Sequence, residues 1–182
     1  LTPDHIDRHG SFEGYGATKE KLFALQTKQD FAVLNHDDPW IRAMAERTGS
    51  RVVFFSRQST LPEGAFVADG EIRLRWEGKE SRICAISDMK LFGGHNVENA
   101  LAACGAAYLA GVSPADMAKV LTSFTGVEHR IEPVATINGV PYYNDSKATN
   151  PESSIKALEA FAGHVVLIAG GRDKNTDLTE FM

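Results

Sequence analysis

The stretch FAVLNHDDPWIRAMAERTGSRVVFFS, residues 31–56, decides the fold. Its two apolar runs, residues 31–35 and 51–56, have the length and the β-branched or aromatic composition of buried strands. The segment between them, residues 37–48, has helical length and opens with an Asp-Pro pair, which is typical of a helix start. Strand, helix and strand in this order predict a βαβ unit with parallel pairing, and hence an α/β fold.

The sequence on both sides of this unit extends the pattern. Asp69-Gly70 is a hairpin turn signal, so the strands around it predict a small antiparallel sheet. Ser113-Pro114 is a helix start. The expected elements are a helix at residues 14–27, strands at 66–68, 71–76 and 82–86, an alanine-rich helix at 95–111 and a helix from 113 to about 124.

A second block follows a hinge expected at residues 126–131. It has only about fifty residues, too few for an independent α/β domain. We therefore expect a first domain over residues 1–128 and a truncated second domain over residues 129–182. The elements expected in the second block are a hairpin turned at Asn138-Gly139, a helix at 151–162, a strand at 165–169 and a helix from about 178.

Composition restricts the class of protein. An apolar fraction of 43% and a charged fraction of 24% are ordinary for a globular chain. No apolar run approaches the roughly 20 residues that cross a bilayer, and the net charge of −5 argues against a nucleic-acid surface. Cys84 and Cys104 lack metal-ligand spacing, which indicates reduced thiols. We expect a cytoplasmic, monomeric protein without a membrane span.

Two polar segments follow expected strands: NDSKATNP at residues 144–151 and GGRDKNTD at residues 170–177. A strand that leads through a polar turn into a helix is where α/β proteins bind anionic ligands. In the second segment Arg172 and Lys174 follow paired glycines, which permit close approach of the backbone to a ligand. An ordinary surface loop is the alternative for that segment.

Three further clusters are candidates for chemistry. Residues 1–9 hold two histidines, two aspartates and an arginine, which could form a metal or phosphate corner or merely a solvated loop. Lys19 follows on a helix, where an exposed lysine is the alternative. His129 and Arg130 lie at the hinge, where the arginine could form an interdomain salt bridge or contact a nucleotide phosphate.

Asn96 and Asn99 belong to GGHNVENALAA, residues 93–103. They are three residues apart and share a helix face. Capping of the helix would explain one amide but not both. A pair of amides could read the edge of a purine base, because each amide offers a donor and an acceptor.

Taken in order, six segments resemble the successive motifs of the Mur ligases, over essentially the whole chain. They are LTPDHIDRH, YGATKEKLF, GGHNVENALAA, FTGVEHRIE, NDSKATNP and LIAGGRDKNTD. Residues 146–149, Ser-Lys-Ala-Thr, resemble the D-glutamate-adding branch more than its sister ligases or the folylpolyglutamate synthases. The resemblance implies a central ATP-binding domain, followed by the start of a Rossmann-like amino-acid-binding domain.

The same resemblance implies an ATP-dependent reaction in peptidoglycan precursor synthesis. UDP-N-acetylmuramoyl-L-alanine would be activated as an acyl phosphate and then attacked by the amine of D-glutamate. His5 would ligate Mg²⁺, and Lys19 would be the lysine that family members carry in carboxylated form near the metal. By the same resemblance, Asn96 and Asn99 would contact adenine, Arg130 would contact the phosphates of ATP, and Asp145 would lie near the ribose and phosphates. Lys147 would orient the reacting carboxylate, with His129 as a helper. Thr149 and Lys174 would bind the carboxylates of D-glutamate.

The chain departs from the family in two respects: we expect that it lacks the amino-terminal domain that would hold the uridine nucleotide, and it lacks the usual phosphate loop. A Gly-rich phosphate loop of the type GxxGKS is absent from the 182 residues. We therefore expect a piece of a longer enzyme that is inactive by itself. A folylpolyglutamate synthase-like ligase and a non-catalytic nucleotide-binding module are the alternatives.

Overall fold

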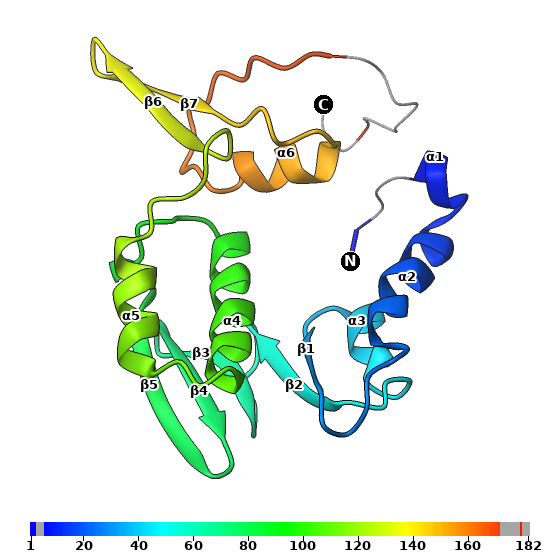
Figure 1. Ribbon diagram of the computed structural model, residues 1–182. Coiled ribbons are helices and arrows are strands. Elements are labelled where there is room, and N and C mark those ends of the chain that lie inside the picture. Colours follow the sequence, from blue (N-terminus) through cyan, green and yellow to red (C-terminus); the bar gives the residue numbers. More distant parts are fainter. Residues whose placement is uncertain (3–5, 172–178, 180–182) are drawn as a thin grey trace. The chain divides into compact units, whose positions relative to one another are not determined.

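The computed structural model describes residues 1–2, 6–171 and 179 (Figure 1). The chain divides into two units, which we describe separately. Unit 1 comprises Leu1–Lys90 and Asn96–Phe124, and unit 2 comprises Leu91–His95 and Thr125–Met182. Over the described residues, no helix is long and apolar enough to cross a membrane.

Unit 1 is built on a five-stranded sheet of order β1-β2-β3-β4-β5. The first three strands pair in parallel and the last three pair antiparallel. The expected βαβ unit is therefore confirmed, while the antiparallel strands continue its sheet and do not form a separate one. The strands are β1 (Phe31–Asn35), β2 (Arg51–Ser56), β3 (Gly64–Ala68), β4 (Glu71–Trp76) and β5 (Lys79–Ala85).

Two helices of unit 1, α3 and α5, begin where the sequence places capping residues. Asp38 caps α3, with its carboxylate accepting from Ile41 N at 3.0 Å, and Ser113 caps α5 in the same way through Asp116 N. Proline occupies the first turn of both helices. The elements are α1 (Ile6–His9), α2 (Phe12–Glu20), η1 (Lys21–Phe23), α3 (Pro39–Met44), η2 (Ile86–Asp88), α4 (Gly94–Leu109) and α5 (Pro114–Ser123).

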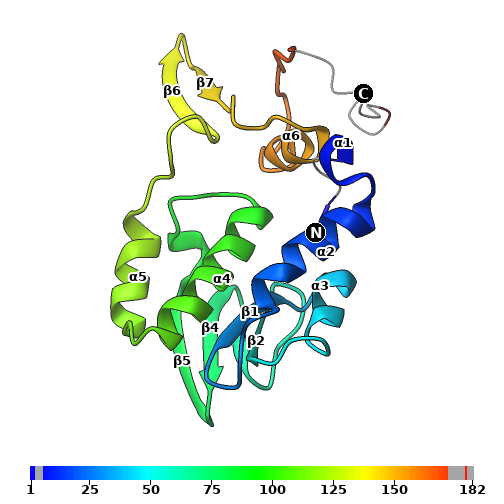
Figure 2. The ribbon, with the colours of Figure 1, turned by 45° about the vertical axis from the view of Figure 1, so that its right-hand side comes forward.

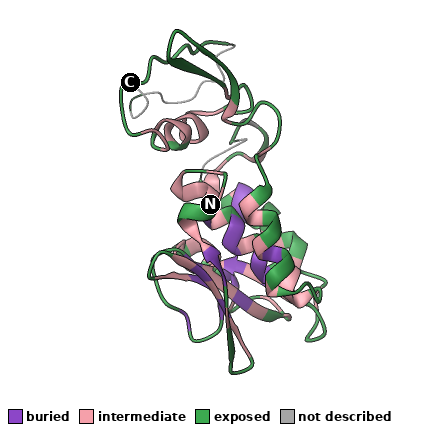
Figure 3. Ribbon diagram, turned by 90° about the vertical axis from the view of Figure 1, so that its left-hand side faces the viewer, coloured by how far each residue is buried: buried purple, intermediate pink, exposed green. Residues whose placement is uncertain are grey.

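Helices α4 and α5 lie over one face of this sheet, and α3 packs on the other face at β1 (Figures 1 and 2). The larger core lies between strands β3 to β5 and helices α4 and α5, and includes the fully buried Ile72 and Leu101 (Figure 3). A second core joins β1 to α3 through Leu34 and Met44. Because successive strand residues point to opposite faces, β2 contributes to both cores, with Phe54 in the second and Phe55 in the first.

Both cysteines lie in the larger core as free thiols, in agreement with the expected reduced state. Burial raises the pKa of the Cys104 thiol to about 12, because the apolar surroundings disfavour the thiolate. Burial also raises the pKa of the Cys84 thiol. Both thiols are therefore expected to be unreactive and to serve only in packing.

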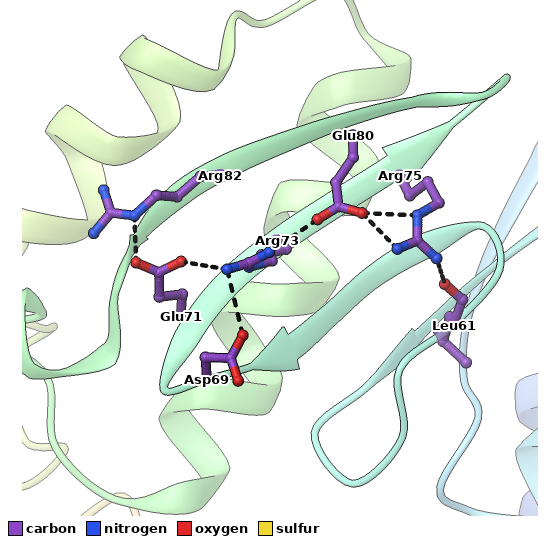
Figure 4. Close-up of polar contacts among 7 residues, drawn as sticks. All are labelled: Leu61, Asp69, Glu71, Arg73, Arg75, Glu80 and Arg82. Carbon is purple, nitrogen blue, oxygen red and sulfur yellow. Dashed lines mark hydrogen bonds and ion pairs between the residues drawn. The ribbon is translucent and has the colours of Figure 1, made fainter.

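The face of β4 and β5 opposite the larger core carries a charged network (Figure 4). Arg73 and Arg82 are directly opposed in the register, which by itself would repel. Glu71 accepts hydrogen bonds from both guanidinium groups, so it neutralises this like-charge pair. Glu80 accepts in turn from Arg73 and Arg75. The network therefore favours the observed register of the hairpin.

Acid should weaken this network. Hydrogen bonds from Arg82, and then from Arg73, hold the pKa of Glu71 below its ordinary value. A depressed folded-state pKa stabilises the fold above the unfolded-state pKa, and this stabilisation is lost as pH falls through the folded-state value. We expect Glu71→Gln to lower the urea midpoint at pH 7, and we expect its difference from the unchanged chain to shrink as pH falls through the folded-state pKa of Glu71.

Fluorescence of the two tryptophans, Trp40 and Trp76, measures this midpoint, because both lie in unit 1. Glu13→Gln is the matched control, since the Glu13 carboxylate has no ion pair in the part of the chain that the structure describes. A midpoint difference for Glu71→Gln of the same size at pH 3 and pH 7 would contradict the prediction.

Unit 2 consists of the hairpin β6 (Glu132–Ile137) and β7 (Val140–Asn144), followed by α6 (Pro151–Leu158). The expected turn is confirmed, with φ of 52° at Asn138 and 80° at Gly139. Asn150 caps α6 by accepting from Ser153 N at 2.8 Å. Phe92, Tyr143 and Phe161 form an aromatic cluster in this unit, with ring centroids 5.0–6.3 Å apart.

One expectation for unit 2 is wrong. Residues 165–169 form no strand, and Val166 and Ile168 are 91% and 94% exposed. A strand needs backbone partners, and none of the described residues offers them here. The strand before NDSKATNP is β7, the second strand of the expected hairpin.

Candidate functional site

In unit 1, Asn96 and Asn99 lie in the first two turns of α4. Asn99 is exposed and Asn96 is partly exposed, while Val97 and Ala100 are buried. The helix begins at Gly94, so neither amide occupies the capping position. The capping alternative is therefore wrong, and the two amides share the accessible face, as their spacing predicts.

A carboxylate at the end of β1 organises the loop after β2. Asp37 accepts hydrogen bonds from the Ser56 hydroxyl, from Arg57 N at 2.8 Å and from Gln58 N at 3.3 Å. The Asp37 side chain is only 7% exposed, and Ser56 is fully buried. Arg57 Nε then donates to Glu98 at 3.2 Å, between the two asparagines of α4 in the sequence. This chain of contacts ties the ends of both parallel strands to the amide-bearing helix.

The hinge in unit 2 has an unusual backbone. His129 has a φ of 66° and Ile131 a φ of 45°, so a left-handed residue lies on each side of Arg130. A β-branched residue in this region is an outlier. Strained conformations of this kind cluster at functional sites, where the surrounding structure holds them in place.

Side chains from β6 and β7 surround His129. Its backbone N–H donates to Glu132 Oε2 at 2.8 Å. Ser146 N donates to Asn144 Oδ1 at 3.1 Å, which orients the amide so that Asn144 Nδ2 lies 2.9 Å from His129 Nδ1. The same Nδ1 atom lies 3.4 Å from Glu132 Oε2, so the ring, the amide and the carboxylate form one polar cluster.

The NDSKATNP loop is bound to the same hinge. Asp145 Oδ1 accepts from Ile131 N at 3.0 Å, and Lys147 N donates to the His129 carbonyl oxygen at 3.0 Å. The side chains of Arg130 and Lys147 remain exposed. The structure thus brings together four residues that the sequence singled out: His129, Arg130, Asp145 and Lys147.

The expected metal corner is only partly described. His5 lies outside the described residues, as do Arg172 and Lys174 of the second polar loop. Lys19 is exposed near the end of α2, with Nζ 5.3 Å from the centroid of the Tyr15 ring, a cation–π contact. Among the described residues, no group of three or more histidines, cysteines, aspartates or glutamates could hold a metal ion.

Comparison with known families shows which proteins this chain resembles. The family model described as Mur ligase middle domain matches residues 1–107. The chain belongs to the Mur ligase family. It is 47% identical over 182 residues to the UDP-N-acetylmuramoylalanine–D-glutamate ligase of Thermoanaerobacter sp. (strain X514), covering all of this chain and 40% of that protein.

Other Mur ligase relatives agree. The ligase of the same name from Acidobacterium capsulatum is 50% identical over 179 residues, which are 97% of this chain and 39% of that protein. The chain spans about 40% of the length of the curated relatives it matches. Among solved structures, MurF from Acinetobacter baumannii superimposes with a TM-score of 0.72 at 20% identity, over 88% of this chain and 35% of that one. At such identity the likeness shows the fold alone.

The folylpolyglutamate synthetase of Lactobacillus casei also has this fold, with a TM-score of 0.53 at 17% identity over 84% of this chain and 41% of that one.

The sequence of this Mur ligase chain did not predict the organising roles of Asp37, Ser56 and Arg57 in unit 1, or of Glu132 in unit 2. An aspartate two residues after a buried strand was an available signal for Asp37. No local pattern marked Glu132.

Proposed function

We propose that this chain is the nucleotide- and amino-acid-binding part of an ATP-dependent ligase that adds D-glutamate to UDP-N-acetylmuramoyl-L-alanine. The observation that supports this most is the identity of 47–50% along essentially the whole chain to ligases of that name. The loop held against the hinge, with its Ser-Lys-Ala-Thr sequence, is a second support. We propose domains over residues 1–128 and 129–182, and a monomeric, cytoplasmic enzyme.

The proposed chemistry joins two anionic substrates. The carboxylate of the muramoyl substrate attacks the γ-phosphorus of ATP, which gives an acyl phosphate and ADP. The amine of D-glutamate then attacks the acyl carbon, and the tetrahedral intermediate collapses with loss of inorganic phosphate. Cations that neutralise the negative charge, and groups that position the reactants, supply most of the catalysis in such transfers.

Several residues of the chain have side chains that suit these tasks. Asn96 and Asn99 would bind adenine, because two exposed-face amides match the donors and acceptors of a purine edge. Arg130 would contact the phosphates of ATP, and Asp145 the ribose and phosphates. Lys147 would neutralise the reacting carboxylate and the acyl phosphate.

The remaining assignments concern the amino acid and the metal. Thr149 and Lys174 would bind the D-glutamate carboxylates, and His129 would assist near the reacting groups. The described residues do not offer a ligand set for Mg²⁺, so no step is assigned to this ion. His5 and a carboxylated Lys19 stay predictions for a metal site.

Phosphate release by a full-length ligase that contains these residues tests the proposal. We expect release to require ATP, UDP-N-acetylmuramoyl-L-alanine and D-glutamate together, with L-glutamate at least roughly tenfold less effective because the site must fit one enantiomer. Release with a folate acceptor and L-glutamate would establish the synthase alternative. ATP binding without release on any pair of substrates would indicate a non-catalytic module.

A further inference from the structure

We propose that Glu132 and Asp145 act as positioning residues, whose carboxylates clamp the strained hinge and thereby fix Arg130 and Lys147 for the reaction. What Arg130 and Lys147 bind rests on the proposed function. The clamp itself rests on the geometry of unit 2 alone. The two parts of the inference can therefore fail separately.

The hinge does not hold its own shape by local preference. Ile131 is β-branched, and a φ of 45° places its Cβ in a region that such residues avoid. His129, with a φ of 66°, adds a second left-handed residue two positions earlier. Backbone conformations with this much strain persist only where contacts with the surrounding structure hold them in place. The contacts of residues 129 and 131 must therefore provide the restraint.

Two carboxylates from different segments provide it. Glu132, at the start of β6, accepts the His129 N–H at 2.8 Å. Asp145, in the loop after β7, accepts the Ile131 N–H at 3.0 Å. The backbone on each side of Arg130 is thus tied to a carboxylate, while the guanidinium remains exposed. The hinge cannot relax without breaking both bonds.

The same clamp reaches Lys147. Its N–H donates to the carbonyl oxygen of His129, the residue whose own N–H is held by Glu132. Asn144 adds a brace, because its Nδ2 lies 2.9 Å from His129 Nδ1 and 3.3 Å from Glu132 Oε2. Loss of the Glu132 carboxylate should therefore release His129, and should thereby displace the side chains of both Arg130 and Lys147.

Kinetics of the full-length ligase test the catalytic part. We expect Glu132→Ala to lower kcat by about 10–100-fold with a smaller change in KM, because misplacement of about 1 Å costs rate at that scale. Glu128→Ala is the matched control: Glu128 is exposed in the same segment and its carboxylate has no hydrogen bond among the described residues. Equal kcat values for the two variants would overturn the positioning role.

Amide hydrogen exchange on the 182-residue chain tests the clamp independently of any activity. We expect Glu132→Ala to speed exchange at His129, and Asp145→Ala to speed it at Ile131, by at least about tenfold. Unchanged exchange at both amides would overturn the clamp. If the full-length protein had no ligase activity but the 182-residue chain showed these exchange changes, the proposed function would be rejected and the clamp would be retained.

A second variant covers the case in which Glu132→Ala unfolds unit 2. Glycine adopts positive φ without strain, so Ile131→Gly should reduce the need for the clamp. We expect the kcat loss from Glu132→Ala to be several-fold smaller in the Ile131→Gly background. Equal losses in both backgrounds would contradict a clamp that acts by restraining strain.

Discussion

Replacement of Lys147 by alanine in the full-length ligase is expected to lower kcat by roughly 10²–10³-fold, the scale for removal of one group that stabilises developing charge. The side chain is exposed, and the loop is held by the backbone N–H of the same residue, which alanine retains. The loss should therefore be chemical and leave the fold intact. Phosphate release under saturating substrates measures it.

Lys156→Ala is the matched control for this change. Lys156 is 57% exposed on α6 of the same unit, and its Nζ pairs with Glu159 at 2.7 Å. Both variants remove one exposed ammonium group from unit 2, so a general effect of net charge would appear in both. The proposed role of Lys147 is rejected if the two variants retain the same kcat.

Gly64→Ala is expected to destabilise unit 1 by about 2–6 kcal/mol, the sum of backbone strain and steric overlap. Gly64 begins β3 with a φ of 121°, a conformation that residues with a side chain rarely adopt. A Cβ atom there would overlap the carbonyl oxygen of Phe54 in β2, which is backbone and cannot rotate away. Urea unfolding followed by tryptophan fluorescence measures the loss.

Gly78→Ala separates these two causes. Gly78 also has a positive φ, 74°, but no atom lies within 4 Å of a Cβ built there. We expect this variant to lose only about 1–2 kcal/mol, the cost of the left-handed conformation. Equal losses for the two glycines would mean that the overlap with Phe54 is relieved by movement of β3.

Features encoded by local chemistry could be predicted from the sequence. The Asp-Pro start of α3 and the Asn138-Gly139 turn each depend on the preferences of adjacent residues, and both are confirmed. The parallel pairing of β1 and β2 followed from their buried character and from the helix between them. The order of the six motifs identified the family before any geometry was known.

Features that depend on partners distant in the sequence could not be predicted in this way. Residues 165–169 have the composition of a strand, but composition cannot supply the neighbouring backbone that a strand requires. Glu132 looks like an ordinary surface acid in the sequence, and its role comes from the His129 N–H that folding brings to it. The donors that Asp37 binds, the Ser56 hydroxyl and Arg57 N, are likewise brought to it by folding. The positive φ of Ile131 runs against its local preference, so no propensity argument could find it.

The mixed pairing of β3 has a consequence for the cooperativity of unit 1. Its backbone bonds to β2 in parallel on one edge and to β4 in antiparallel fashion on the other. Release of β3 would expose backbone groups of both neighbours at once, and would open the larger core at the buried Ala65. The βαβ half and the hairpin half are therefore coupled thermodynamically, and unit 1 should melt in a single transition.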